Sequence, residues 1–435
     1  MNLKNLLSKD FRHTALNQIW KLFSSPLLLI LLPIYLTPEA QGYWYTFISM
    51  AALAVFADMG FSAVLLLFSA HEFAHLSFND RKILIGQEAN LIRMATLFMF
   101  AARWSATMAF ITFPIVLLIG FYILDSKQST ADWKLPWLIY GASSILVFFN
   151  SMLLSFIEGC DSVSDAQKIR FQTSIATFAS TFILLILGAG LYALAISLLA
   201  GAITSSLLIF KKYKNMIFQL YKKGLVEHHP WRQETLPLIW RFAISWISGY
   251  FIFSIFTPIA FHYYGAIEAG KVGLSMAVCT AVFGISNIWI TAITPKMNIH
   301  VAQNNYLALN SEFKRSLCMA TLTYFLGILA FIFAFKALKN HIPLIDRLVS
   351  IDAFLMISLG WLAQLIINSL AIYMRTHKKE PLVIVSVTNG IYVCISTILA
   401  AAYLPFEYFF IGFISAYLIV LPWVCKIFTQ HYKKA

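Results

Sequence analysis

Charged residues are scarce in this sequence of 435 residues: they make up 12% of it, against about 25% in a typical soluble domain. Hydrophobic residues make up 60%. This composition excludes an ordinary soluble domain and predicts an all-α polytopic membrane protein. Cysteine is scarce too, and five cysteines scattered over apolar segments and loops predict no disulfide framework.

Long polar segments are also missing. Apolar segments long enough to cross a bilayer core of about 30 Å cover residues 14–36, 43–69, 94–124, 135–158, 171–188, 190–210, 237–262, 270–294, 316–338, 350–374, 382–403 and 408–428. This pattern predicts twelve transmembrane helices. The first segment lacks a small-x-small cleavage pattern, so we expect it to remain as a span. The weakest division is Leu187-Gly188-Ala189-Gly190, where a continuous apolar run must turn on two glycines.

The net charge of +13 is unevenly distributed along the chain. Most of the 32 Lys and Arg residues fall in loops and tails on one side of the predicted bilayer, and by the positive-inside rule that side is cytoplasmic and holds both termini. This one-sided distribution argues against nucleic acid as a partner. The basic residues expected on the opposite side are Lys127, Lys134, Lys271, Lys336, Lys339 and Arg347.

The longest cytoplasmic connection divides the chain into two halves. We expect a six-helix bundle in residues 1–210, a basic cytoplasmic linker in 211–236 and a second six-helix bundle in 237–435. Six spans per half predict parallel repeats, as in transporters built from two like bundles around a central cavity. The loops on the outer side are too short for the catalytic groups of a polysaccharide polymerase or ligase.

Two opposite charges lie in the first two predicted helices. With a helical rise of about 1.5 Å per residue, Lys21 lies roughly 24 Å and Asp58 roughly 25 Å below the turn that joins these helices. Ionisable groups inside a membrane are costly and usually face an interior cavity, so the pair predicts a polar pathway. The alternative is a purely structural ion pair.

Other polar residues fall near the same depth. Gln364 and Asn368 are four residues apart on one helix face, and Asn150 and Asn287 lie at a similar level. Arg103 and Arg241 come slightly deeper, at about 30 Å from the outer helix ends. A cationic layer that binds an anionic substrate is one interpretation. The other is that the amides join neighbouring helices and that the arginines extend to lipid headgroups.

A short motif carries a resemblance to a known family. The run Gly42-Tyr43-Trp44 and the later Asp58-Met59-Gly60-Phe61 with Ser62 resemble the start of the O-antigen flippase (Wzx-like) and polysaccharide-exporter families, with Met59 in place of the usual aromatic residue. The predicted spans, the two halves and the basic linker fit these families over the whole chain. The resemblance implies the fold of the multidrug/oligosaccharidyl-lipid/polysaccharide exporter superfamily.

The resemblance also implies a function. The expected substrate is an undecaprenyl-diphosphate-linked oligosaccharide, moved from the cytoplasmic to the periplasmic leaflet of a bacterial inner membrane by alternating access. The expected partners are this lipid-linked substrate, membrane lipid and other polysaccharide assembly proteins, with no enzyme activity and no cofactor. We expect Lys21, Arg103 and Arg241 to bind the diphosphate, and Asp58 to neutralise Lys21 or carry a coupling proton. Gln364 and Asn368 are further expected substrate-binding residues.

Two other functions remain open. His71-Glu72-Phe73-Ala74-His75 matches H-E-x-x-H, in which two histidines bind zinc and the glutamate acts as base, so an integral-membrane metalloprotease is one alternative. No Asp-Gly dipeptide and no obvious third ligand accompany the motif, which favours a solvated loop helix. A drug exporter of the same fold is the other alternative, and its cavity for cations should be net acidic.

Overall fold

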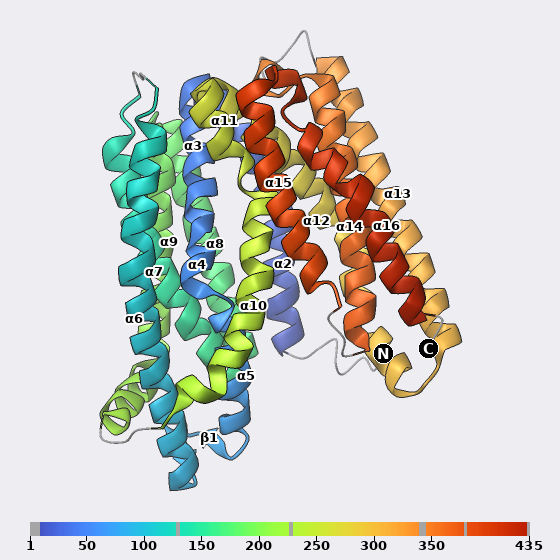
Figure 1. Ribbon diagram of the computed structural model, residues 1–435. Coiled ribbons are helices and arrows are strands. Elements are labelled where there is room, and N and C mark those ends of the chain that lie inside the picture. Colours follow the sequence, from blue (N-terminus) through green and yellow to red (C-terminus); the bar gives the residue numbers. More distant parts are fainter. Residues whose placement is uncertain (1–8, 128–130, 226–228, 339–344, 378–380, 433–435) are drawn as a thin grey trace. The chain divides into compact units, whose positions relative to one another are not determined.

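A computed structural model describes residues 9–127, 131–225, 229–338, 345–377 and 381–432 (Figure 1). Nearly all of these residues are helical. The α-helices are α2 (Lys9–Tyr35), α3 (Pro38–Ala51), α4 (Val55–Asp58), α5 (Phe61–Phe73), α6 (Glu88–Leu124), α7 (Lys134–Gly159), α8 (Val163–Ile186), α9 (Leu191–Gly224), α10 (Trp231–Phe253), α11 (Phe256–Tyr264), α12 (Ala266–Ala302), α13 (Tyr306–Leu338), α14 (Ile351–Thr376), α15 (Val383–Tyr403) and α16 (Ile411–Tyr432). Short 3₁₀ turns are η1 (Ala52–Ala54), η2 (Ile345–Arg347) and η3 (Phe406–Tyr408), and the strands are β1 (Leu76–Phe78) and β2 (Leu84–Gly86).

The helices are long and apolar enough to cross a membrane. Within the described ranges, 11 helices meet this criterion, and a bent pair of segments raises the number to 12. The protein is therefore a multi-pass, all-α membrane protein, as the sequence predicted. The predicted turn on two glycines is also confirmed: α8 ends at Ile186, Gly188 and Gly190 take positive φ angles of 74° and 55°, and α9 begins at Leu191.

The second predicted span is not one continuous helix. Residues Pro38–Asp58 and Phe61–Phe73 are bent by 44° relative to each other. The break lies at Met59 and Gly60, which both adopt the left-handed conformation, with φ angles of 47° and 74°. Such residues cannot continue a right-handed helix, so Asp58 becomes the last residue of α4 instead of a mid-helix residue.

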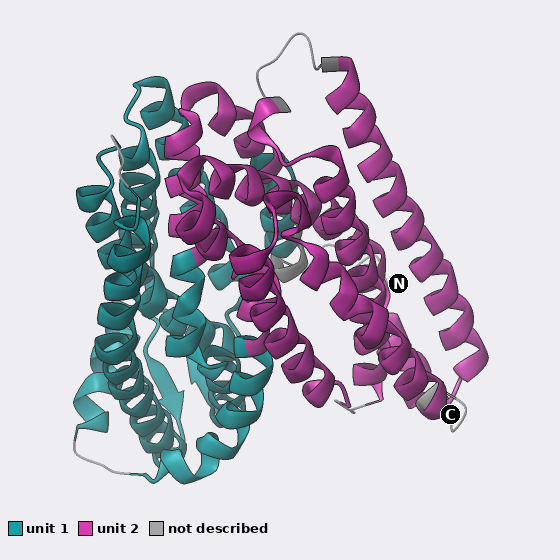
Figure 2. Cartoon of the chain, turned by 45° about the horizontal axis from the view of Figure 1, so that its top comes forward, with its two compact units in different colours: residues 1–24, 50–247 teal, residues 25–49, 248–435 magenta. Residues whose placement is uncertain are grey.

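The chain divides into two compact units (Figure 2). Unit 1 comprises Met1–Ser24 and Met50–Ile247, and unit 2 comprises Ser25–Ser49 and Ser248–Ala435. These bounds differ from the halves expected from the sequence, because the end of α2 and most of α3, up to Ser49, belong to unit 2. The amide of Gln41 donates to the Gly270 carbonyl oxygen at 3.0 Å, and the Arg347 guanidinium donates to the Leu36 carbonyl oxygen at 2.9 Å.

The expected linker is largely helical. Residues 211–224 continue α9, and residues 231–236 begin α10. In unit 1 this extension of α9 supports a small hairpin, which the sequence did not predict, in which β1 and β2 pair antiparallel. The Gln219 side chain accepts from the Leu84 N–H at 2.9 Å and donates to the Leu84 carbonyl at 2.8 Å. We call the part of unit 1 that carries β1 and β2 the hairpin end.

Candidate functional site

Asp58 occupies the break between α4 and α5. Its Oδ1 accepts hydrogen bonds from the Ser62 backbone N–H at 3.2 Å and the Ser62 hydroxyl at 2.5 Å. A carboxylate in this position stabilises the N-terminus of α5, where backbone N–H groups lack partners within the helix. The second oxygen, Oδ2, is buried and has no hydrogen-bond partner among the described residues. An ionised oxygen in that state is costly, so Asp58 is well placed to receive a proton or a cation.

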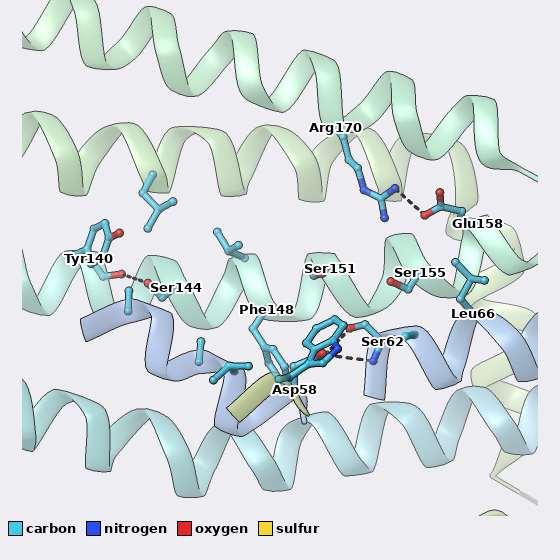
Figure 3. A pocket seen from close by; sticks show the side chains of 17 residues that line it. Asp58, Ser62, Leu66, Tyr140, Ser144, Phe148, Ser151, Ser155, Glu158 and Arg170 are labelled. Atoms are coloured by element: carbon cyan, nitrogen blue, oxygen red, sulfur yellow. Dashed lines mark hydrogen bonds and ion pairs between the residues drawn. The ribbon is translucent and has the colours of Figure 1, made fainter. Parts of the chain in front are cut away.

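A pocket of about 620 Å³ in unit 1 contains Asp58 in its wall (Figure 3). Small or apolar side chains form much of the rest, and Trp246 adds an indole. Figure 3 shows Tyr140 at one end of the pocket and Glu158 with Arg170 at the other. The charged lining residues are Asp58, Glu158 and Arg170, so the pocket carries one net negative charge when all three are ionised.

One face of α7 lines this pocket. Its lining residues follow the helical spacing of four and three residues, and they are Tyr140, Ser144, Val147, Phe148, Ser151, Ser155 and Glu158. Glu158 accepts from Arg170 on α8 at 2.6 Å and from the Gln167 amide at 3.2 Å. Asn17 on α2 in turn donates to Gln167 at 3.0 Å. Three helices therefore hold the Glu158 carboxylate in place.

The expected phosphate-binding residues are not among the residues lining this pocket. Arg103 lies on α6 and Arg241 on α10, and both side chains are exposed. Within the described ranges, neither guanidinium pairs with a carboxylate. The backbone of Lys21 lies in α2, but its side chain falls outside the described residues, so the predicted pair of Lys21 with Asp58 stays a prediction.

The predicted amide residues of unit 2 are joined to neighbouring helices. The Asn368 amide donates to Asn287 Oδ1 at 2.9 Å, and the Tyr417 hydroxyl donates to Gln364 Oε1 at 3.1 Å. Both Gln364 and Asn368 are half-buried. In unit 1, Asn150 is buried and bonded to the Ala202 carbonyl and the Ser206 hydroxyl on α9. Asn150 therefore joins α7 to α9. This agrees with the alternative interpretation, in which the amide side chains join neighbouring helices.

The H-E-x-x-H motif falls at the end of a helix. α5 ends at Phe73, so His71 lies in its last turn and His75 lies beyond it, and both histidines are exposed. Glu72 is instead buried, which corrects the prediction that the whole motif is a solvated loop helix. No group of three or more His, Cys, Asp or Glu side chains in the described part of the chain could hold a metal ion.

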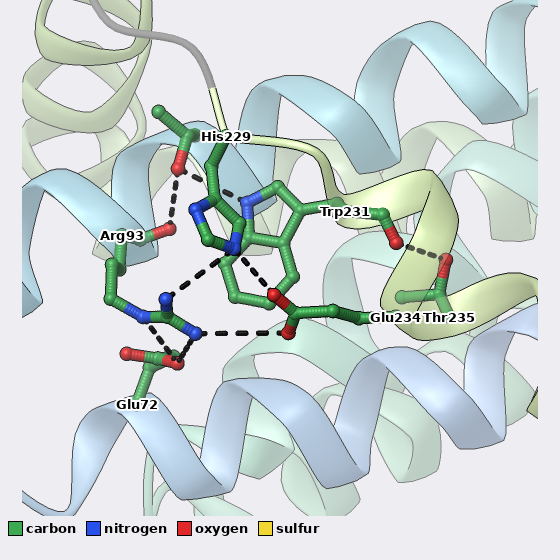
Figure 4. Close-up of polar contacts among 7 residues, drawn as sticks. Glu72, Arg93, His229, Trp231, Glu234 and Thr235 are labelled. Carbon is green, nitrogen blue, oxygen red and sulfur yellow. Dashed lines mark hydrogen bonds and ion pairs between the residues drawn. The ribbon is translucent and has the colours of Figure 1, made fainter.

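Glu72 belongs to a polar cluster at the hairpin end (Figure 4). Both Nε and Nη2 of Arg93 contact Glu72 Oε1, at 2.9 and 2.8 Å, and Nη2 lies 3.8 Å from Glu234. His229 bonds to Glu234 at 2.6 Å, and the guanidinium carbon of Arg93 lies 4.9 Å from the centre of the Trp231 ring. We call these five residues the Arg93 cluster. Because Glu72 is bound to Arg93, it is not free to act as the base of a zinc protease.

Comparison with solved structures identifies the fold. A structure titled "Lipid II flippase MurJ, inward closed conformation" matches with a TM-score of 0.64 at 12% identity, covering 95% of this chain and 86% of that one. An inward-facing multidrug resistance MATE family transporter of the MOP superfamily matches with a TM-score of 0.59 at 12% identity, covering 91% and 94%. This chain has the same fold as these two proteins. No family model and no curated protein sequence matches it.

The fold brings together residues that the sequence had not connected. Glu158 on α7 and Arg170 on α8 belong to different helices, and no sequence pattern indicated that they pair. Trp246 and the serines of α7 were not singled out. The available signal was the spacing of Ser144, Ser151, Ser155 and Glu158, which places polar side chains on one face of an otherwise apolar helix.

Proposed function

We propose that this protein is a flippase that moves an undecaprenyl-diphosphate-linked oligosaccharide from the cytoplasmic to the periplasmic leaflet of a bacterial inner membrane. The observation that carries the proposal is the pair of exposed arginines, Arg103 on α6 and Arg241 on α10, without carboxylate partners among the described residues. A guanidinium on a membrane-spanning helix is costly unless water or an anion accompanies it. A diphosphate supplies such an anion, and two planar guanidinium groups suit its geometry.

The energetics of the headgroup support this substrate. A diphosphate with several sugars is too polar to cross hydrocarbon unaided, because burying charge without a partner is far worse than burying a hydroxyl. Fixed cations lower that barrier while the polyprenyl chain stays in lipid. An inside-negative potential also favours outward movement, by about 2.3 kcal/mol per elementary charge per 100 mV.

Within this proposal the residues have separate roles. Lys21, Arg103 and Arg241 bind the diphosphate, and Gln364 and Asn368 are further substrate-binding residues. Asp58 carries a coupling proton, which its unpartnered Oδ2 supports. The hairpin end faces the cytoplasm, together with both termini, since the loops there are rich in Lys and Arg.

The experiment measures which leaflet holds the substrate. In cells that depend on this protein for export, Arg103→Ala and Arg241→Ala are each expected to lower export of the lipid-linked oligosaccharide at least about tenfold, since a hydrogen bond to a charged group contributes about 1.5 to 3 kcal/mol. The substrate should accumulate on the cytoplasmic leaflet. Lys21→Ala is tested in the same way.

The controls separate charge from folding. Arg103→Lys and Arg241→Lys keep the charge and should retain more export than the alanine variants. Arg232, exposed on the first turn of α10, is the matched control, and Arg232→Ala should export normally. Wild-type export by both Arg103→Ala and Arg241→Ala would reject the diphosphate-binding role.

A second candidate function is export of organic cations. It is favoured by the pocket around Asp58, because its lining is largely apolar and carries one net negative charge, as a cation exporter requires. The test is efflux of ethidium from cells that produce the wild-type protein or Asp58→Asn. Efflux by the wild type that Asp58→Asn abolishes would support this second function. The same ethidium accumulation with and without the wild-type protein would exclude ethidium export.

A further inference from the structure

A second cavity continues the Asp58 pocket toward the hairpin end. It measures about 440 Å³ and is lined by residues of α5, β1 and the end of α7. On α5 the lining passes from Ser62 and Leu66 in the first pocket to Ala70 and Phe73 in the second, which is one face of the helix. The two cavities therefore follow one groove between α5 and α7.

Glu158 lies where the two cavities meet, because it lines both of them. Its side chain is 15% exposed, and that of its partner Arg170 is 29% exposed. The groove is narrow at this level: a Cβ on Gly159 would lie 1.9 Å from the Ser69 hydroxyl oxygen and 2.6 Å from the Leu66 carbonyl oxygen. Backbone and side chains of α5 and α7 thus approach closely beside the ion pair.

Charged side chains line the groove from the hairpin end to the Asp58 pocket. Asp161 lines the second cavity and is exposed, Glu158 and Arg170 occupy the junction, and Asp58 lines the first pocket. While Arg170 is bound to Glu158, its guanidinium repels a cation at the junction. When the pair separates, the Glu158 carboxylate attracts a cation toward Asp58. Ser151 and Ser155 on α7 also line the first pocket, and their hydroxyl groups can solvate a cation that moves from Glu158 to Asp58.

We propose that the Glu158–Arg170 ion pair is a gate that controls passage of water and small cations from the hairpin-end cavity to the Asp58 pocket within unit 1. The gate requires no particular transported substrate. It goes beyond the proposed function, because it concerns access to Asp58 through a single unit of the protein. Either the flippase or the cation exporter could use it.

A cysteine reporter tests the gate without any substrate. Ser155 lies one turn from Glu158, lines the first pocket and is 7% exposed. In the full-length protein with its five native cysteines replaced, Ser155→Cys is treated on the hairpin side of the membrane with a trimethylammonium or a sulfonate methanethiosulfonate reagent, and the two modification rates are measured. With the gate intact, both rates should be low.

Gate variants should change the two rates differently. Arg170→Gln removes the cation from the junction and is expected to raise the rate with the ammonium reagent about tenfold, and the sulfonate rate much less. Glu158→Gln leaves the guanidinium and should favour the sulfonate reagent instead. This reversal of charge preference would not follow from a loss of packing alone.

Ser143 provides the matched control on the same helix. It is fully buried, lines neither cavity and donates its hydroxyl to the Ile139 carbonyl oxygen. Ser143→Cys should react slowly in every background. Equal rates at Ser155→Cys in the wild-type and both gate backgrounds would overturn the gate, and so would an equal rise at Ser143→Cys. Neither result would bear on export of the lipid-linked oligosaccharide, which is measured separately.

Discussion

Replacing Gly42 by alanine is expected to lower the free energy of unfolding by at least about 3 kcal/mol, at the upper end of the range for overpacked sites. A Cβ at this position would lie 1.8 Å from the carbonyl oxygen of Ala266 and 2.5 Å from its carbonyl carbon. These atoms belong to the backbone of α12, so no side-chain rotation relieves the clash. α3 and α12 must move apart, which also strains the hydrogen bond from Gln41 to the Gly270 carbonyl.

The control for this prediction is a glycine with open space around it. Gly284 lies in α12, and a Cβ at this position would have no neighbouring atom within 4 Å. Gly284→Ala is expected to raise the free energy of unfolding by up to about 1 kcal/mol through helix propensity. The measurement is unfolding of both variants in the same detergent. Equal stability of Gly42→Ala and Gly284→Ala would mean that α3 and α12 are not packed as described.

Arg93→Ala is expected to destabilise unit 1 by about 2 to 3 kcal/mol. The Glu72 side chain is 6% exposed, and without Arg93 its carboxylate loses a hydrogen bond and its ion-pair partner. Removing one partner of a buried ion pair costs about 3 to 5 kcal/mol, and the lower figure here reflects the 38% exposure of the Arg93 side chain. Loss of the contact with the Trp231 ring adds to the effect.

A double-mutant cycle isolates this interaction. Adding Glu72→Ala to Arg93→Ala removes the uncompensated carboxylate, so the double variant should be more stable than the sum of the two single changes predicts. Arg93→Lys should lie between wild type and Arg93→Ala, because an ammonium cannot reproduce the paired contacts of Nε and Nη2. Strictly additive effects in chemical unfolding would contradict the Glu72–Arg93 pairing.

Export and zinc-binding measurements distinguish a structural role of Glu72 in the Arg93 cluster from a catalytic role in a zinc protease. His71→Ala should leave stability and export unchanged, since the side chain is exposed. Under the protease hypothesis it would abolish activity, together with zinc binding measured by metal analysis. If the wild-type protein binds zinc and His71→Ala does not, the result would support the enzyme interpretation.

Hydropathy alone was sufficient to predict which segments of the chain span the membrane. A span is a local property, because some 20 apolar residues must bury themselves in lipid whatever their neighbours are. The two glycines at 188 and 190 were likewise readable, since a chain that must reverse within a few residues needs positive φ angles. The break after Asp58 was not predicted, because a single Met-Gly sequence inside an apolar run is compatible with a continuous helix.

The sequence by itself determined the membrane class and the segments that span, because these follow from local composition. Only the tertiary structure decided the partners: Glu72 with Arg93, Glu158 with Arg170, and Asn287 with Asn368. The same holds for the association of most of α3, up to Ser49, with unit 2. Depth along a helix is set by residue number, but a contact also depends on helix rotation and packing, which residues distant in the chain fix together.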